Sequence, residues 1–360
     1  MTTPVTTFDQ PAASASPTFD GIVGGESGPS DGLAHDIAPV RTSDPTRLMS
    51  DRIIAAIEAG TPPWRRPWTG GCRSLPRRVT GEAYRGINLL MLWLAGAEMG
   101  CASPHWMTRL QAQALGGQVR EGERAALVVK FGVVTKGRED GQGAPATGEA
   151  RTDQEGARRP YLKAYDVFNG GQIDGLPARF GHEADPPRDL GTRADAELEA
   201  YFGRLGATVE TSPEPRAFYH PGRDVIQMPP VATFHATEGY YATLGHEAVH
   251  WTGHGSRLGR LAGRKGRQAC AFEELVAEVG QCMLLATLGL EPAVDQSAAY
   301  VEGWLQVLRD DKRAIFRAAS QAQKAVDLIR ERCGESAEGA VAAEPGDDPI
   351  IGEARWRAAA

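Results

Sequence analysis

Several features that would place this chain of 360 residues in a familiar class are missing from its sequence. No apolar run approaches the roughly 18 residues that a membrane span needs, and the longest candidate, residues 87–97, is interrupted by Asn88. The N-terminus has neither the basic start nor the apolar stretch of a secretory signal. The five cysteines form no C-x-x-C pair, which argues against a disulfide framework and a four-cysteine zinc site. We therefore expect a cytoplasmic protein with no membrane partner.

The overall charge argues against a nucleic-acid partner until its distribution is considered. The chain carries 39 Lys and Arg against 46 Asp and Glu, a net charge of −7. Residues 47–138, however, hold fourteen basic and six acidic side chains and so carry +8, whereas residues 1–46 carry −5. Twelve of those fourteen are Arg, which pairs bidentately with phosphate and stacks on bases. The distribution favours nucleic-acid binding by the first half of the chain.

Three stretches have the composition of disordered segments. Residues 1–45 are rich in Thr, Ser, Pro, Gly and Asp, residues 137–159 in Gly, Glu, Asp and Ala, and residues 334–360 in Ala, Gly and acidic side chains. We predict two disordered acidic tails and, at 137–159, a mobile hairpin insertion. The rest of the sequence falls into two blocks, residues 46–180 and 188–330.

The first block is predicted to be an α+β module. An N-cap at Asp44 followed by a proline begins a helix, and a Gly-Thr-Pro-Pro sequence ends it. Thr108 caps another helix, which stops at a Gly-Gly pair. Strand-like runs flank the insertion. The predicted elements are helices over about 45–59, 87–99 and 108–116, and strands over 126–135 and 161–168.

The second block is predicted to be mainly helical, with a small β-hairpin around Pro221 and Gly222. The chain as a whole is therefore of the α+β class. The predicted elements of this block are hairpin strands over 216–219 and 225–228 and helices over about 194–205, 239–252, 271–288, 298–308 and 311–329.

Basic and aromatic side chains alternate in the densest part of the basic block. Arginines can follow a phosphate backbone while aromatic faces stack on bases without reading their sequence. An equally open alternative is that Trp64 and Trp68 belong to the core and that the arginines form a solvated face. Trp106 fits either interpretation. The candidate DNA-binding residues are Trp64, Arg65, Arg66, Trp68, Arg77, Arg78, Tyr84, Arg85 and Trp106.

The strongest local signal is an H-E-x-x-H motif formed by His246, Glu247 and His250. On a helix, positions four apart are offset by only about 40°, so the two imidazoles face one point and can share a Zn²⁺ ion. The Glu of this motif acts as general base towards water at the metal. The alternative is a pair of structural histidines, which an otherwise apolar helix makes less favourable.

A catalytic zinc needs a third protein ligand, and three residues compete for that role. His254 follows Gly253 by one residue and could serve only after a sharp turn. Glu274 lies on the next predicted helix, and Glu278, four residues later on the same face, could orient a ligand histidine. Glu273 points about 100° away from that face and is the weaker candidate. The sequence favours Glu274 as ligand, with Glu278 behind it.

Together these segments resemble the ArdC-type antirestriction proteins of plasmids and other mobile elements. Their N-terminal domain is shared with TraC-type plasmid primases. The resemblance covers about residues 46–330 in order. The matching segments are GTPPWRRPW at 60–68, YRGIN at 84–88, SPHW at 103–106, QAQALGGQ at 111–118, YDVFN at 165–169, GYYATLGHEAVHWTGH at 239–254, EELVAE at 273–278 and DDKRAIF at 310–316.

The resemblance implies an N-terminal domain that binds single-stranded DNA and a C-terminal zincin-like metallopeptidase domain. It also implies a role in protecting incoming DNA from host restriction. The leading interpretation joins non-specific single-stranded-DNA binding to zinc-dependent hydrolysis of a protein or peptide substrate. The alternative is a protein that only coats and protects single-stranded DNA, with a structural zinc site. A role as replication accessory has little support, because no primase carboxylate set is present.

Overall fold

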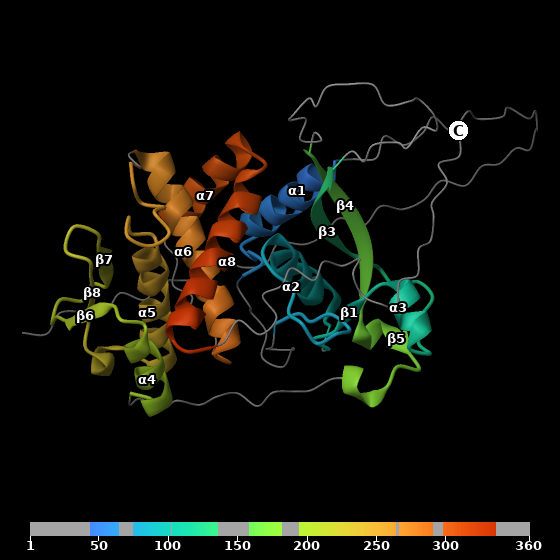
Figure 1. Cartoon of the computed structure of the whole chain (residues 1–360), viewed down its shortest axis with the longest axis horizontal. Coiled ribbons are helices and arrows are strands. Elements are labelled where there is room, and N and C mark those ends of the chain that lie inside the picture. Colours follow the sequence, from blue (N-terminus) through green and yellow to red (C-terminus); the bar gives the residue numbers. More distant parts are fainter. Residues whose placement is uncertain are drawn as a thin grey trace, which may run out of the picture. The chain divides into compact units, whose positions relative to one another are not determined.

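The computed structural model describes residues 44–64, 75–101, 103–135, 158–181, 194–263, 266–290 and 298–335 (Figure 1). Residues 1–43 and 336–360 lie outside these ranges, and so does all of the predicted insertion except its last two residues. Arg65, Arg66 and Trp68 are outside them as well. Within the described ranges, no helix is long and apolar enough to cross a membrane.

Three helices of the first block form where the sequence predicts them. Helix α1 (Pro45–Glu58) begins at Asp44, whose side chain accepts a hydrogen bond from the backbone of Thr46. Helix α2 (Ile87–Met99) is apolar on nearly all sides, and eight of its thirteen residues are buried. Helix α3 (Arg109–Ala114) begins at Thr108, whose side chain and that of Gln111 form a capping box. These signals are local, which is why the sequence reveals them.

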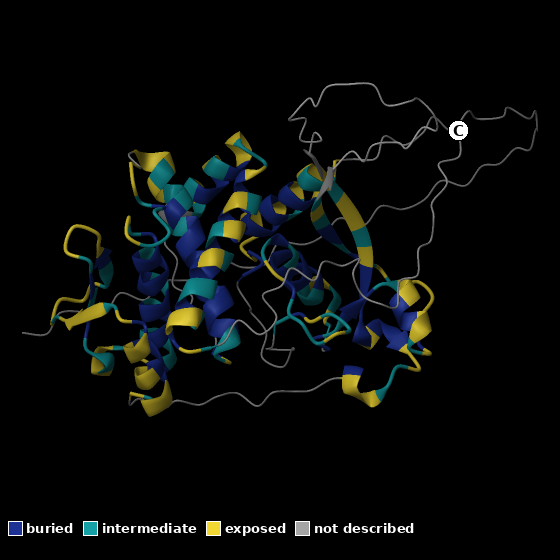
Figure 2. Cartoon of the chain, viewed as in Figure 1, coloured by how far each residue is buried: buried dark blue, intermediate teal, exposed yellow. Residues whose placement is uncertain are grey.

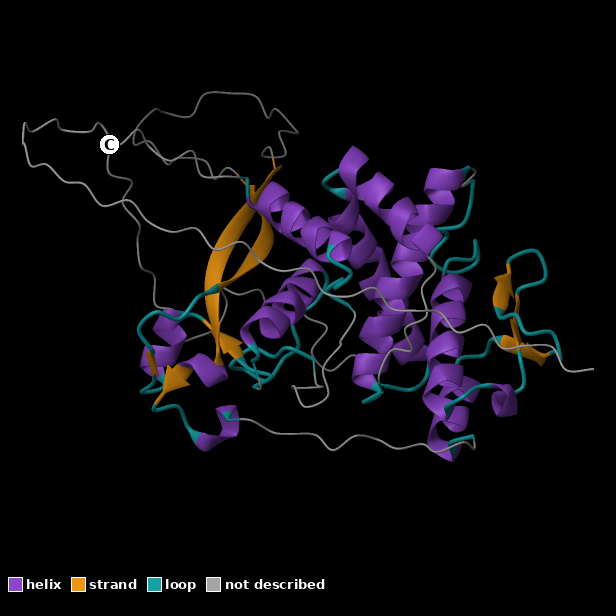
Figure 3. Ribbon diagram, turned by 180° about the vertical axis from the view of Figure 1, so that it is seen from behind, coloured by secondary structure: helices purple, strands orange, loops and turns teal. Residues whose placement is uncertain are grey.

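The main sheet of this block has the strand order β1-β4-β3. Strand β3 (Ala126–Thr135) pairs antiparallel with β4 (Arg158–Asn169) along its full length, and Figure 3 shows the two as a long twisted ribbon. Strand β1 (Trp106–Met107) pairs with the far end of β4. A smaller pair joins β2 (Gln118–Val119) to β5 (Ile173–Asp174), and short 3₁₀ turns cover Gly170–Gln172 and Ala178–Phe180.

The second block opens with helix α4 (Ala196–Arg204) and a three-stranded sheet in the order β6-β8-β7. The predicted hairpin is present as β7 (Phe218–His220) and β8 (Val225–Met228). Strand β6 (Thr208–Thr211), which the sequence analysis missed, pairs parallel with β8. All four of its residues are exposed, so it shows none of the alternation that marks a strand.

Four helices complete the block after a 3₁₀ turn at Val231–Thr233. Strand β7 lies at the edge of its sheet and contacts α5. Helices α6 and α8 make the most extensive helix contact, because α8 turns a row of buried alanines towards its neighbours. The helices are α5 (Thr237–Thr252), α6 (Arg267–Thr287), α7 (Ala298–Asp310) and α8 (Ala314–Arg332).

One apolar core joins the two blocks. The described residues belong to a single compact unit, and their largest hydrophobic cluster includes residues of α1 and α2 as well as of α5 to α8. Buried residues are dark blue in Figure 2. At the junction, the fully buried ring of Trp64 contacts that of Trp304 edge to face, with 5.9 Å between the ring centres. The α+β class predicted from the sequence is confirmed, with a helical second block that carries a small sheet.

Candidate metal centre

Helices α5 and α6 bring the predicted metal ligands together. His246 and His250 lie one turn apart on α5, with 4.9 Å between their ring centres. Gly280 on α6 lies against Val249, and a Cβ atom at Gly280 would stand only 3.0 Å from that side chain. The missing side chain lets the two helices approach closely enough for Glu274, nearly two turns earlier on α6, to reach both histidines.

Glu274 lies between the two imidazoles. Its Oε2 is 3.5 Å from Nε2 of His246, and its Oε1 is 3.6 Å from Nε2 of His250. One ligand atom from each of these three residues lies within 4.8 Å of the others. Two imidazole nitrogens and one carboxylate oxygen are the donor set of a catalytic zinc with an open coordination position, so the residues present fit a divalent cation. All three side chains are partly exposed.

The other two candidates for the third ligand lie elsewhere. His254 is outside the cluster, and its Nδ1 is 2.8 Å from Oγ of Ser256. Glu273 lies on the opposite side of the His250 ring from Glu274, with its Oε1 3.3 Å from Nδ1. Glu278 has a similar place behind His246, at 3.8 Å from Nδ1, which is too long for a direct hydrogen bond.

Arg260 supports Glu273 in a way that the sequence analysis did not foresee. Its buried guanidinium donates to both carboxylate oxygens of Glu273, at 3.2 Å from Nε and 2.9 Å from Nη2. It also donates to the side chain of Thr252 and to the backbone carbonyl of Val249 at the end of α5. The loop after α5 is thereby tied to the carboxylate behind His250. Arg260 lies in the loop between α5 and α6, outside every motif named in the sequence analysis.

The carboxylates set the charge state of the metal-free site. Burial disfavours a charged His250, but its contacts with Glu273 and Glu274 outweigh burial and raise the pKa of His250 to about 10. Burial would in turn raise the pKa of Glu274, yet the two histidines hold that pKa well below its usual range. In the metal-free site His250 is therefore protonated at neutral pH, and a binding cation has to displace that proton.

Glu247 is held by the edge strand of the small sheet. Its carboxylate is buried, and its Oε2 accepts a hydrogen bond of 2.8 Å from the backbone N–H of Tyr219 on β7. The phenol of Tyr219 donates to Asp224 over 2.7 Å, and Arg257 donates to both residues. The guanidinium of Arg257 lies 3.9 Å from the ring centre of Trp251, which belongs to α5, the metal helix that carries His246 and His250. The predicted hairpin is thus fastened to α5.

The structure corrects the predicted stacking residues of the basic block. Trp64, Tyr84 and Trp106 are 0%, 3% and 2% exposed, so their rings fill the core and have no free face for a base. The alternative left open for Trp64 and Trp106 is the correct one. The exposed Arg85 forms an ion pair with Asp327 on α8, and the exposed Arg77 donates to the carbonyl of Gly81.

Arg78 remains close to the surface but is turned inward. Its guanidinium lies 5.3 Å from the ring centre of the buried Tyr84. Of the nine predicted DNA-binding residues, those that the structure describes therefore supply cations but no exposed aromatic face.

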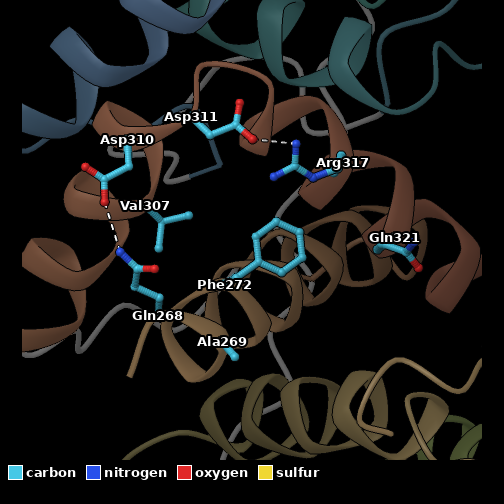
Figure 4. Close-up of a pocket in the computed structure, with 8 residues that line it drawn as sticks. All are labelled: Gln268, Ala269, Phe272, Val307, Asp310, Asp311, Arg317 and Gln321. Carbon is cyan, nitrogen blue, oxygen red and sulfur yellow. Dashed lines mark hydrogen bonds and ion pairs between the residues drawn. The ribbon is translucent and has the colours of Figure 1, made fainter. Parts of the chain in front are cut away.

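A separate cavity of about 360 Å³ lies where the start of α6 meets α7 and α8 (Figure 4). Its polar lining is largely self-paired. Gln268 donates to Asp310 over 3.0 Å, and Arg317 pairs with Asp311 over 2.7 Å. The DDKRAIF segment thus contributes Asp310 and Asp311 to the lining of this cavity, where both are paired.

Comparison with known proteins agrees with this geometry. The family model of a zincin-like metallopeptidase matches residues 196–321, and that of the N-terminal domain of anti-restriction factor ArdC matches residues 43–168. The fold and the site thus define a protein with a zincin-like metallopeptidase domain. A crystal structure of the antirestriction ArdC protein from plasmid R388, in its metal-free form, is 55% identical with a TM-score of 0.71. The match covers 81% of this chain and 98% of that one, so the chain belongs to the ArdC family.

Other relatives extend the comparison. The Mn(II)-bound structure of the R388 protein is 54% identical, with a TM-score of 0.69 and 99% of that chain covered. An uncharacterized protein y4eC of Sinorhizobium fredii is 38% identical over 82% of this chain and 95% of its own length. A DNA primase TraC of Escherichia coli is 37% identical over 78% of this chain, but only 26% of the primase is covered. The match therefore spans about a quarter of that relative.

Proposed function

We propose that this chain is an antirestriction protein of a mobile element that joins two activities. It binds single-stranded DNA without sequence preference through residues of its first block, and its second block is a zinc-dependent metallopeptidase. The observation that carries the enzymatic half is the convergence of His246, His250 and Glu274 beside the buried carboxylate of Glu247. The +8 charge of residues 47–138 supports the DNA-binding half.

In the proposed reaction, His246, His250 and Glu274 hold the cation. A Zn²⁺ ion held there would supply Lewis-acid polarisation of a peptide carbonyl and of water. Glu247 takes the proton of the attacking water and passes it to the leaving amine. Its Oε2 is already engaged by the backbone of Tyr219, which leaves Oε1 to carry the proton. Glu273, at Nδ1 of His250, keeps that imidazole oriented with Nε2 towards the cation, and Glu278 places a negative charge behind His246.

The second candidate is a protein that only binds and protects single-stranded DNA, with a structural metal. The hydrogen bond between Tyr219 and Glu247 favours it, because a carboxylate already bonded to the backbone can serve to fix the hairpin. Both candidates require the same cation ligands. They differ in whether Glu247 has to exchange protons.

The substitution Glu247→Gln separates the two candidates. Gln keeps an oxygen for Tyr219 but cannot act as a base, so we expect bound zinc and DNA affinity to stay at wild-type levels. Hydrolysis of an unstructured protein substrate should fall by at least a hundredfold, and a chelator should abolish the wild-type activity. The cellular readout is the efficiency with which unmodified DNA enters a restricting host. Full protection by Glu247→Gln would favour the binding-only candidate.

A further inference from the structure

Three exposed arginines of the first block, Arg77, Arg109 and Arg179, have no carboxylate partner among the described residues. Other exposed arginines of the block are neutralised, since Arg85 pairs with a carboxylate of α8 and Arg120 pairs with two carboxylates of its own block. An unpaired guanidinium keeps its charge and most of its N–H donors for an outside anion. The three arginines therefore supply charge that the fold itself does not use.

Arg109 and Arg179 are held over aromatic rings that belong to the core. The guanidinium of Arg109 lies 5.1 Å from the ring centre of Phe168, and that of Arg179 lies 4.6 Å from the ring centre of Phe180. Both rings are buried, at 6% and 2% exposure, in one small apolar cluster. A cation at this distance over an aromatic face is attracted by the ring. The core thus fixes where the two guanidinium groups lie and leaves their N–H donors available.

Arg77 borders the same cluster through His105. The two residues are partners in a parallel β-bridge, so their side chains point to the same face. The ring of His105 contacts that of Phe180 edge to face, with 5.1 Å between the ring centres, and so links Arg77 to the ring that carries Arg179. A hydrogen bond of 2.8 Å from the Arg77 guanidinium to the carbonyl of Gly81 steadies the side chain without neutralising its charge.

The pairing of β1 with β4 brings Arg109 to the same place. Phe168, which lies under Arg109, is opposite Met107, the second residue after His105. Residues two apart on a strand share a face and lie about 7 Å apart, so His105 and Met107 project to the same side. Figure 1 shows β1 and α3 beside this end of β4. We call the resulting set the arginine surface, formed by Arg77, Arg109 and Arg179.

The two rings under the arginine surface are covered, so they cannot stack on a base. Glu121 and Asp166, two exposed carboxylates of the same block, pair with none of the three arginines. Guanidinium groups bind phosphate oxygens bidentately, and contacts to phosphate carry no information about base sequence. A surface of this kind fits the backbone of a nucleic acid that is bound without sequence preference.

We propose that the arginine surface binds the phosphate backbone of single-stranded DNA. The proposal rests on the proposed DNA-binding function and assigns part of it to three residues, of which only Arg77 was predicted from the sequence. Each guanidinium contacts one phosphate, and the rings beneath Arg109 and Arg179 keep those two groups in position. The bases make no contact with this surface.

Fluorescence anisotropy of the full-length protein with labelled dT20 tests the arginine surface. Each of Arg77→Gln, Arg109→Gln and Arg179→Gln should reduce the steepness of log affinity against log salt by about 0.7, the loss of one phosphate contact on a single strand. The triple variant should reduce it by about 2 and bind about tenfold or more weakly in low salt. Arg216→Gln is the matched control, because Arg216 is an exposed arginine over the ring of Phe218 in the second block, and it should leave the slope unchanged.

Lysine substitutions separate the charge of these residues from their packing. Arg109→Lys and Arg179→Lys keep a positive charge at each position, so both variants should retain the wild-type salt slope. A loss of binding caused only by uncovering Phe168 or Phe180 would not be restored by lysine. Melting temperatures of all variants show that the measurements are made on folded protein.

An abasic 20-mer identifies the part of DNA that the arginine surface contacts. It carries the phosphates of dT20 without the bases, so the triple variant should lose affinity by the same factor on both strands. A loss confined to dT20 would show that the arginines contact bases and would overturn the phosphate contact. Absence of dT20 binding by the wild type would overturn the proposed DNA-binding function itself. Wild-type binding together with unchanged salt slopes in all three glutamine variants would overturn the arginine surface alone.

Discussion

The backbone N–H of Tyr219 donates to Oε2 of Glu247 over 2.8 Å, so an edge strand holds the proposed general base of the metal helix. The contact fixes one of the two carboxylate oxygens of a buried side chain. Asp224 and Arg257 hold the phenol end of the same tyrosine, which keeps the strand from shifting along α5. The position of Glu247 therefore depends on a residue that no metallopeptidase motif includes.

Replacing Tyr219 by Ala and by Pro isolates this hydrogen bond. Both substitutions remove the phenol, but only proline also removes the backbone N–H. That N–H donates to Glu247, so proline breaks no hydrogen bond between β7 and β8. We expect Tyr219→Pro to be less stable than Tyr219→Ala by about 1.5–3 kcal/mol, the range for a hydrogen bond to a charged acceptor. Urea unfolding of the metal-free proteins measures the difference. In a Glu247→Ala background the difference should nearly disappear, and its persistence would show that proline strain is the cause.

The clamp around Tyr219 predicts a pH dependence of stability. The hydrogen bond from Arg257, with a smaller one from Tyr219, lowers the pKa of Asp224 from 3.8 to about 2. A carboxylate with a lowered pKa stabilises the fold fully above its unfolded pKa, and this stabilisation is lost as the pH falls from about 4 to 2. We expect Asp224→Asn to lower the melting temperature at pH 7 by a small amount, because Asp224 is 40% exposed. The difference in melting temperature between Asp224→Asn and wild type should decrease as the pH is lowered from about 4 to 2. A difference that stays constant would show that the charge of Asp224 does not stabilise the fold.

Glu273 is not a proposed metal ligand, but its contact with His250 predicts that replacing it will lower the metal affinity. Glu273→Gln keeps an acceptor for Arg260 but removes the charge beside Nδ1 of His250. Loss of such a supporting carboxylate typically costs 10- to 100-fold in metal affinity, so we expect a Zn²⁺ affinity about tenfold or more below wild type. Competition with a chromophoric chelator measures it. Glu302→Gln, at a residue with a side chain 66% exposed on α7, is the control and should match wild type.

The third ligand can be tested by metal stoichiometry. Glu274→Ala removes the carboxylate that lies between the two imidazoles, so we expect less than one zinc per chain after dialysis. His254→Ala should retain a full equivalent, because His254 is engaged with Ser256 outside the cluster. Elemental analysis of both variants and of wild type gives the comparison. The reverse pattern would move the third ligand to His254.

The metal helix could be predicted in detail because its signal is periodic and local. The spacing of His246 and His250 places both rings on one face of any helix, and Glu274 with Glu278 follows the same rule one helix later. Arg260 and Tyr219 could not be found in this way. One acts from an irregular loop and the other through its backbone N–H, which any residue except proline would supply.

Strand β6 and the aromatic residues of the basic block show a second limit of the sequence. Strand β6 has no buried side, so its pairing with β8 leaves no pattern in the residues. Tryptophans beside arginines are compatible with a binding surface and with a core, since the chemistry of the ring suits both. Only the packing of Trp64 against Trp304, more than 200 residues away, decides between them.

This burial changes what a substitution at Trp64 should do. Trp64 is fully buried against Trp304 at the junction of the two blocks, so Trp64→Ala should cost about 3–5 kcal/mol of stability through the cavity it leaves. Any loss of DNA binding in that variant should follow its unfolded fraction. Trp64→Phe preserves most of the apolar contact and should bind dT20 with wild-type affinity when assayed well below its melting temperature. A tenfold loss of affinity in a fully folded Trp64→Phe protein would show that the Trp64 ring contacts DNA.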